Sequence, residues 1–162
     1  MDTRLRNMTS LYLTSGDRFL LLYRVGSRVV ADSFTGTAGG HFEQGELNDP
    51  RACVLRELRE ETGLSADDIE NLALRYVTLR MKNGEIRQNY YYFAHLKHPA
   101  REIASNEGRL QWFDRSELDG LAMPYTARHM LAHYCREGRG TRLLYGGVAT
   151  EDGVRFTALR EF

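Results

Sequence analysis

Short runs rich in hydrophobic residues, separated by polar turn residues, predict strands along much of the chain. Three pairs of such runs predict hairpins, at residues 8–14 with 19–24, 72–81 with 86–96, and 143–149 with 154–159. The middle pair flanks Asn83-Gly84, a dipeptide typical of two-residue hairpin turns. Within it, Tyr90, Tyr91 and Tyr92 favour a strand and alternate between its faces, so at most one face can stack on a ligand; core packing is the default expectation.

Helical spacing of apolar residues predicts two helices. The first covers residues 50–62, with Asn48 or Asp49 as its cap, Pro50 in its first turn and Gly63 at its end. The second covers residues 124–135, after a strand near 112–113 and a helical turn at 116–121. There is no repeat or linker, so we expect one α/β domain with a mixed sheet over residues 1–162, closed by a C-terminal helix and hairpin at 124–160.

Composition excludes some classes of protein. Lys plus Arg and Asp plus Glu are both 22, and this balance argues against stable nucleic-acid binding. No apolar run is long enough for a signal peptide or a membrane span. The two cysteines indicate free thiols in a reducing compartment. We therefore expect a soluble cytoplasmic protein without a membrane partner, either a monomer or a homodimer.

The chemistry is concentrated in the first helix. Glu57, Glu60 and Glu61 are spaced i, i+3 and i+4, which places three carboxylates on one helical face, where they repel each other. A hard divalent cation such as Mg²⁺ or Mn²⁺ would neutralise them. The alternative is a solvated acidic helix in which Arg56 and Arg59 are the partners of these glutamates.

The segment before this helix supports the first interpretation. The glycine pair Gly39-Gly40 allows the backbone to approach a ligand closely, and Glu43 and Glu46 add two carboxylates. Residues 40–64 resemble the Nudix box, with matches at Gly40, at Glu46, and in the run Arg56-Glu57-Leu58-Arg59-Glu60-Glu61-Thr62-Gly63-Leu64. One departure is that the stretch between Glu46 and Arg56 is two residues longer than in the family pattern, around Leu47-Asn48-Asp49.

The resemblance implies an α/β/α sandwich with a catalytic loop-helix-loop that hydrolyses a phosphoanhydride bond in a nucleoside diphosphate derivative. By this resemblance Glu57, Glu60 and Glu61 bind the metal with the Gly39 carbonyl, and Arg56 orients the glutamates. Gly40, Glu43 and Glu46 belong to the substrate-binding loop, although the longer stretch leaves the placement of both glutamates open. Glu107 either joins the metal site, as a later glutamate does in MutT-like members, or is an ordinary turn residue.

Elimination favours the MutT-like branch, which acts on nucleoside triphosphates such as 8-oxo-dGTP and releases the monophosphate and pyrophosphate. Leu79 stands where many ADP-ribose hydrolases have proline, and the motifs of the diadenosine polyphosphate, NADH and coenzyme A branches are missing. We expect Met123, Tyr125 and Thr126 to read the base; the alternative is that they pack and cap the second helix. Another Nudix substrate (ADP-ribose, a nucleotide sugar or a dinucleoside polyphosphate) and a non-catalytic sensing module remain alternatives.

Overall fold

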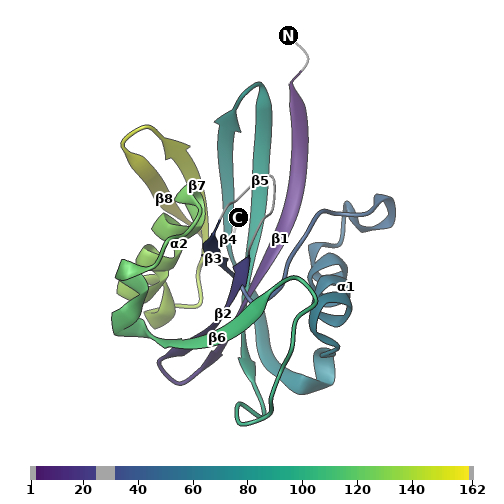
Figure 1. The fold of residues 1–162 in the computed structure, drawn as a ribbon. Helices are drawn as coiled ribbons and strands as arrows, with labels where there is room; N and C mark the ends of the chain where they lie inside the picture. Colours follow the sequence, from purple (N-terminus) through teal and green to yellow (C-terminus); the bar gives the residue numbers. More distant parts are fainter. Residues whose placement is uncertain (1–2, 25–31, 161–162) are drawn as a thin grey trace.

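The computed structural model describes residues 3–24 and 32–160 of the chain. The strands are β1 (Arg4–Ser15), β2 (Arg18–Arg24), β3 (Ser33–Thr35), β4 (Ile69–Lys82), β5 (Glu85–Leu96), β6 (Arg109–Asp114), β7 (Leu144–Thr150) and β8 (Gly153–Leu159). The α-helices are α1 (Pro50–Thr62) and α2 (Tyr125–Arg136), and short 3-10 turns lie at Gln44–Glu46, Ala66–Asp68, Arg115–Gly120 and Gly138–Gly140. The three hairpins and both helices expected from the sequence are present (Figure 1).

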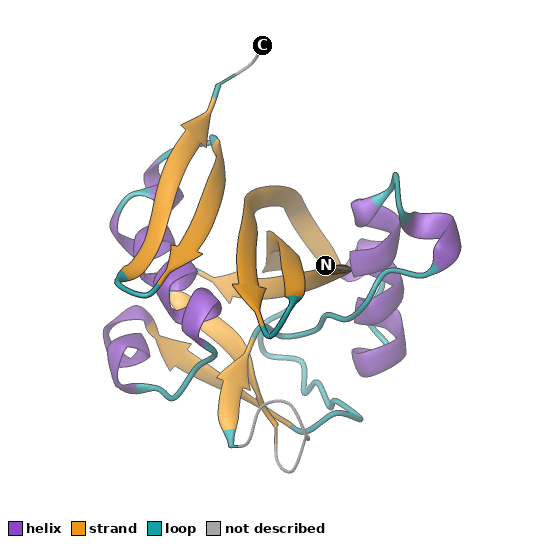
Figure 2. Cartoon of the chain, turned by 90° about the horizontal axis from the view of Figure 1, so that it is seen from above, coloured by secondary structure: helices purple, strands orange, loops and turns teal. Residues whose placement is uncertain are grey.

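The strands form a mixed sheet in the order β3-β2-β1-β5-β4-β7-β8, and β6 also pairs with β2. The pairs β1–β5 and β4–β7 are parallel, and the other pairs are antiparallel. The helices α1 and α2 lie on opposite sides of the strands, as the view from above makes plain (Figure 2). This arrangement confirms the expected α/β fold with a mixed sheet between helices.

Each face of the sheet has its own hydrophobic core. Tyr91 packs with α2 residues such as Met130, whereas Tyr92 packs with α1 residues such as Leu58. Tyr90 lies against the same core as Tyr92, so the predicted alternation of the three tyrosines is confirmed. The two cores fix α1 and α2 at set positions above and below the same strands.

Strand ends differ from the sequence expectation where distant pairing decides them. The strand β1 begins at Arg4, four residues before the expected start at Met8, because Arg4 to Asn7 pair in parallel with Glu85 to Gln88 of β5. The turn between β4 and β5 is as predicted: Asn83 and Gly84 have φ angles of 52° and 72°. The extended β1–β5 pair supplies one end of the cavity beside α2.

Two further expectations concern the chain as a whole. Cys53 is buried and Cys135 half-buried, and both are free thiols, as expected. Within residues 3–24 and 32–160, neither helix has the length and apolar character that a membrane crossing requires.

Candidate active site

The helix α1 is fixed at both ends by local signals. The Asp49 carboxylate accepts a hydrogen bond from the backbone N–H of Ala52 at 2.9 Å, so Asp49 is the cap and Asn48 is not. The helix ends at Gly63, whose φ of 73° is left-handed. Val54 and Leu58 are fully buried against the sheet. Glu61 lies on this same buried side of α1, one turn after Leu58, where it reaches the loop that precedes the helix.

That loop runs along β1. The backbone N–H of Thr9 donates to the Gly40 carbonyl at 2.8 Å, and the N–H of Leu11 donates to the Ala38 carbonyl at 2.7 Å. A β-carbon at Gly39 would overlap the Thr9 carbonyl oxygen, and a β-carbon at Gly40 would overlap the Glu57 carboxylate. Gly39 is therefore required for the backbone to fit against β1, and Gly40 is required for the Glu57 carboxylate to keep its position.

Glu61 lies where the loop, the helix and the cavity meet. Its carboxylate accepts the Gly39 N–H at 3.2 Å and pairs with Arg24 at 3.4 Å, and the residue is only 8 % exposed. Burial raises the pKa of Glu61 to about 7; the Gly39 bond and Arg24 lower it, and the charges of Glu57 and Glu107 raise it. Burial also raises the pKa of Glu57.

Arg56 donates hydrogen bonds to three glutamates. Its Nε donates to Glu46 at 2.6 Å and its Nη2 to the second Glu46 oxygen at 2.9 Å, a bidentate pair. Its Nη1 donates to Glu57 at 2.9 Å and to Glu60 at 3.0 Å. The hydrogen bonds from Arg56 lower the pKa of Glu46 to about 2. All the carboxylates that Arg56 contacts belong to the Nudix-like segment.

The two extra residues in this segment leave the contact between Glu46 and Arg56 intact. Leu47 and Asn48 are exposed and lie between the Gln44–Glu46 turn and the Asp49 cap. The two additional residues therefore lengthen an exposed part of the chain. Glu43 caps the turn, lies 3.9 Å from Arg56 and is exposed.

The remaining expected ligands lie at the edge of the group. The Glu60 side chain is 57 % exposed and contacts Arg56. The Glu107 carboxylate pairs with Arg24 at 3.2 Å, and Arg24 also pairs with Glu61. Glu107, from the loop before β6, is therefore brought next to the α1 glutamates by a shared arginine.

Oxygen donors dominate this group, and Mg²⁺ and Mn²⁺ prefer such ligands. Within the described ranges, no three acidic, histidine or cysteine side chains already converge on one point. Burial raises the pKa of both Glu57 and Glu61, and a bound cation would compensate these carboxylates for the solvation that they have lost. This donor set fits a hard divalent cation.

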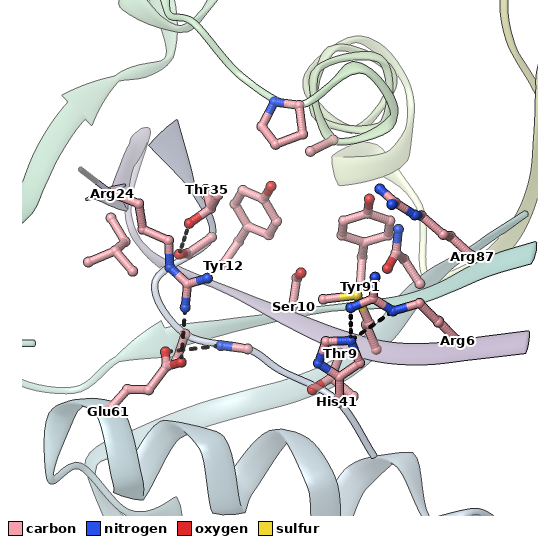
Figure 3. A pocket seen from close by; sticks show the side chains of 18 residues that line it. Arg6, Thr9, Ser10, Tyr12, Arg24, Thr35, His41, Glu61, Arg87 and Tyr91 are labelled. Atoms are coloured by element: carbon pink, nitrogen blue, oxygen red, sulfur yellow. Dashed lines mark hydrogen bonds and ion pairs between the residues drawn. The ribbon is translucent and has the colours of Figure 1, made fainter. Parts of the chain in front are cut away.

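A cavity of about 260 Å³ opens beside Glu61, between the sheet and α2. Tyr12 and Tyr91 line its middle, and Gly39 and Arg24 lie with Glu61 at one end (Figure 3). Arg6 and Arg87 lie at the other end (Figure 3). The sequence interpretation missed these lining residues, except Gly39 and Glu61 in the Nudix-like segment. Arg6 could have been identified from the alternation of side chains along β1, because this alternation puts Arg6 and Tyr12 on the same face of the strand.

The expected base-reading residues lie at the start of α2 and just before it. Met123, Tyr125 and Thr126 do not line the cavity; Pro124 and Ala127 do. The Tyr125 hydroxyl donates to the Thr150 carbonyl at 2.8 Å, toward the β7–β8 turn. Thr126 is buried and Met123 packs against the α2-side core, which agrees with the packing alternative. The helix α2 begins at Tyr125, and its rotation about its axis turns these side chains away from the cavity. The sequence pattern did not predict this rotation.

Comparison with known proteins agrees with this geometry. The model of the NUDIX domain matches residues 4–134. YvcI, an uncharacterized Nudix hydrolase of Bacillus subtilis, is 32 % identical over 149 residues, which are 89 % of this chain and 86 % of that protein. A GDP-mannose pyrophosphatase of Yersinia pestis is 27 % identical over 119 residues, 65 % of this chain and 58 % of that protein.

Solved structures give the same fold. A MutT protein from Bacillus halodurans superposes with a TM-score of 0.65 at 22 % identity, and the match covers 93 % of this chain and 97 % of that one. The extent of the family match and the similarity to YvcI decide the assignment. The chain therefore belongs to the Nudix family and is a Nudix hydrolase.

Proposed function

We propose that this protein hydrolyses a phosphoanhydride bond in a nucleoside diphosphate derivative at the group formed by α1 and the Gly39-Gly40 loop. The observation that carries the proposal is the position of Glu61, which joins α1, the glycine loop and one end of the 260 Å³ cavity. A substrate whose diphosphate lies at Glu61 can extend one of its substituents between Tyr12 and Tyr91.

In this proposal Glu57, Glu60 and Glu61 hold Mg²⁺ or Mn²⁺, with the Gly39 carbonyl and Glu107 as further ligands. The bound cation supplies neutralisation of phosphate charge and a lowered pKa of bound water. Arg56 positions the Glu57 and Glu60 carboxylates through its bonds at 2.9 and 3.0 Å. A carboxylate of this group accepts the proton of the attacking water, which adds to phosphorus while the anhydride P–O bond breaks.

Two substrate classes follow from different observations. The MutT-like interpretation of the sequence and the fold of MutT proteins favour a nucleoside triphosphate such as 8-oxo-dGTP, with a monophosphate and pyrophosphate as products. The similarity to a GDP-mannose pyrophosphatase favours a nucleotide sugar, with a nucleoside monophosphate and a sugar phosphate as products. In both classes the diphosphate lies at the same carboxylates, so the products distinguish the two classes.

The test is a hydrolysis screen over nucleoside triphosphates, nucleotide sugars and dinucleotides with Mg²⁺, with the products identified by chromatography. We expect Glu61→Gln to lower kcat by about 100-fold or more, because a neutral amide is a poor ligand for a hard cation. The matched control is Glu70→Gln, since Glu70 is exposed on β4 outside this group. Equal kcat for Glu61→Gln and the control on the best substrate would contradict the assignment.

A further inference from the structure

Three arginines form a row across adjacent strands at the end of the cavity far from Glu61. Arg6 on β1 is the register partner of Arg87 on β5, and Arg87 is the register partner of Arg80 on β4. Like charges at directly opposed positions of a sheet destabilise it. The row therefore opposes folding unless other groups compensate for its charge.

The charge compensation within the described residues is incomplete. Arg6 also donates from Nε to the His41 ring at 3.1 Å, but an imidazole supplies no negative charge. Glu85 accepts a hydrogen bond from Arg6 at 3.2 Å and another from Arg87 at 2.8 Å, and the described residues provide no second carboxylate in an ion pair with the row. Arg80 lies over the ring of Tyr125, with its guanidinium carbon 4.7 Å from the ring centre. One carboxylate thus faces three guanidinium groups.

The charge of the neighbouring register positions increases the imbalance. Glu85 is paired in register with Arg4 on one side and with Lys82 on the other. These positions lie at the same end of the three strands as the arginine row. The excess positive charge is therefore a property of this whole strand end and not of a single side chain.

Two of the three arginines in the row line the cavity. Arg6 and Arg87 line the cavity together with Asn89, whereas Glu85 is not part of the lining. The side chains of Arg6 and Arg87 are only 30 % and 29 % exposed, so part of their hydration is already lost. Arg87 bonds Glu85 through Nε, and its guanidinium lies at the end of the cavity opposite Arg24 (Figure 3).

We propose that Arg6 and Arg87, backed by Arg80, bind a phosphate monoester carried by the part of the substrate that occupies the cavity. This inference rests on the proposed function, since it places the diphosphate at Glu61 and the second phosphate at the opposite end. Arginine is suited to the task because its planar fork of donors matches phosphate geometry. A phosphate monoester also brings the negative charge that the row lacks, which a neutral base or sugar does not.

The proposal narrows the substrate class to nucleoside diphosphate derivatives with an additional phosphate. That phosphate is either on the nucleoside or at the end of the other substituent. NADPH and coenzyme A represent the first chemistry, although the chain lacks the motifs of the NADH and coenzyme A branches, and a diphosphate-linked sugar phosphate represents the second. The chemistry at the arginines is the same in both cases. The cavity of about 260 Å³ is slightly smaller than a typical whole-ligand pocket, so it suits one half of such a molecule.

The first experiment compares hydrolysis of pairs of compounds that differ by one phosphate: NADPH with NADH, coenzyme A with dephospho-coenzyme A, and a nucleotide-linked sugar phosphate with the nucleotide sugar. We expect KM to be at least about tenfold lower for the phosphorylated member of one pair, from a charge-assisted hydrogen bond. Arg6→Gln and Arg87→Gln should each remove most of this difference while kcat changes little. The pair that shows the effect identifies which half of the substrate carries the phosphate.

The matched control is Arg136→Gln, because Arg136 is an exposed arginine on α2 away from the cavity. Equal KM values within every pair, or the same phosphate preference in Arg87→Gln as in wild type, would overturn the inference. If wild type hydrolyses none of the compounds in either screen, the proposed function fails instead.

A second readout is independent of turnover. At constant ionic strength and without Mg²⁺, inorganic phosphate should raise the melting temperature of wild type and of Arg136→Gln. It should raise that of Arg6→Gln and Arg87→Gln much less. Without phosphate, Arg87→Gln should melt close to wild type, because the loss of the partly exposed Glu85 pair is offset by removal of a like-charge contact on each side. An equal effect of phosphate on all four proteins would overturn the inference even if no substrate is found.

Discussion

The ion pair between Glu46 and Arg56 gives a quantitative prediction about stability. Replacing Glu46 by glutamine keeps the size of the side chain and removes its charge. The pKa of Glu46 falls from 4.5 to about 2 in the folded protein because Arg56 donates two hydrogen bonds to it. Because the folded-state pKa is depressed, the pair contributes its full stability above pH 4.5 and loses it as the pH falls toward 2.

The size of the effect follows from this pKa change. A change from 4.5 to about 2 corresponds to about 3 kcal/mol at full conversion. The side chains of Glu46 and Arg56 are 11 % and 21 % exposed, and partial screening by solvent reduces the expected loss to about 1 to 2 kcal/mol. For a chain of 162 residues this is a fall in melting temperature of about 3 to 6 °C.

The assay is urea unfolding of wild type and Glu46→Gln at pH 7 and at pH 3. The difference in unfolding free energy should be largest at pH 7 and should shrink at pH 3. Glu43→Gln is the matched control, because Glu43 lies 3.9 Å from Arg56 with a side chain 67 % exposed, and its loss should have almost no effect. A Glu46→Gln protein as stable as Glu43→Gln at pH 7, or a difference that does not change with pH, would refute the reasoning.

Three further predictions concern the loop, the cation and a buried histidine. Gly40→Ala should lower kcat strongly because its β-carbon would displace the Glu57 carboxylate, whereas Gly45→Ala, where a β-carbon meets no atom within 4 Å, should leave kcat unchanged. Mg²⁺ at 100 times its Kd should stabilise wild type by about 2.7 kcal/mol in thermal unfolding, and a Glu61→Gln protein stabilised equally would contradict the ligand assignment. Burial lowers the pKa of His133, so its neutral form is favoured in the fold and stability should decrease as pH falls below 6.5. His133→Gln should weaken this dependence between pH 8 and 5, and an unchanged slope would exclude His133 as its source.

The helix α1 could be predicted from the sequence because its determinants are local. The cap Asp49, the proline after it and Gly63 lie within the segment itself, and the observed bounds of α1 are those predicted. The glutamate spacing also follows from helix geometry alone. The bidentate pair between Glu46 and Arg56 could not be predicted, because the longer stretch between them left the path of the chain open.

The cavity could not be predicted because its walls come from distant segments. Arg6 and Arg87 become neighbours only through the parallel register of β1 and β5. The rotation of α2 decided the position of Tyr125, whose hydroxyl bonds Thr150 in a hairpin that starts well after the helix. The residue pattern predicts which face of its own helix or strand a side chain occupies. It does not predict which residues of another element lie opposite that face.

The parallel pairing of β1 with β5 has a consequence for how the enzyme folds. The strand β1 is synthesised before its partner β5, which ends at Leu96, and Thr14 bonds His95 across 81 residues of chain. Contacts of such sequence separation close large loops and slow folding. The carboxylates of α1 can gather on a local helix early, but the cavity beside them forms only after β5 has joined β1. Catalytic competence is therefore acquired late, and a nascent chain that ends before β5 has the Nudix segment but no place for the substrate to bind.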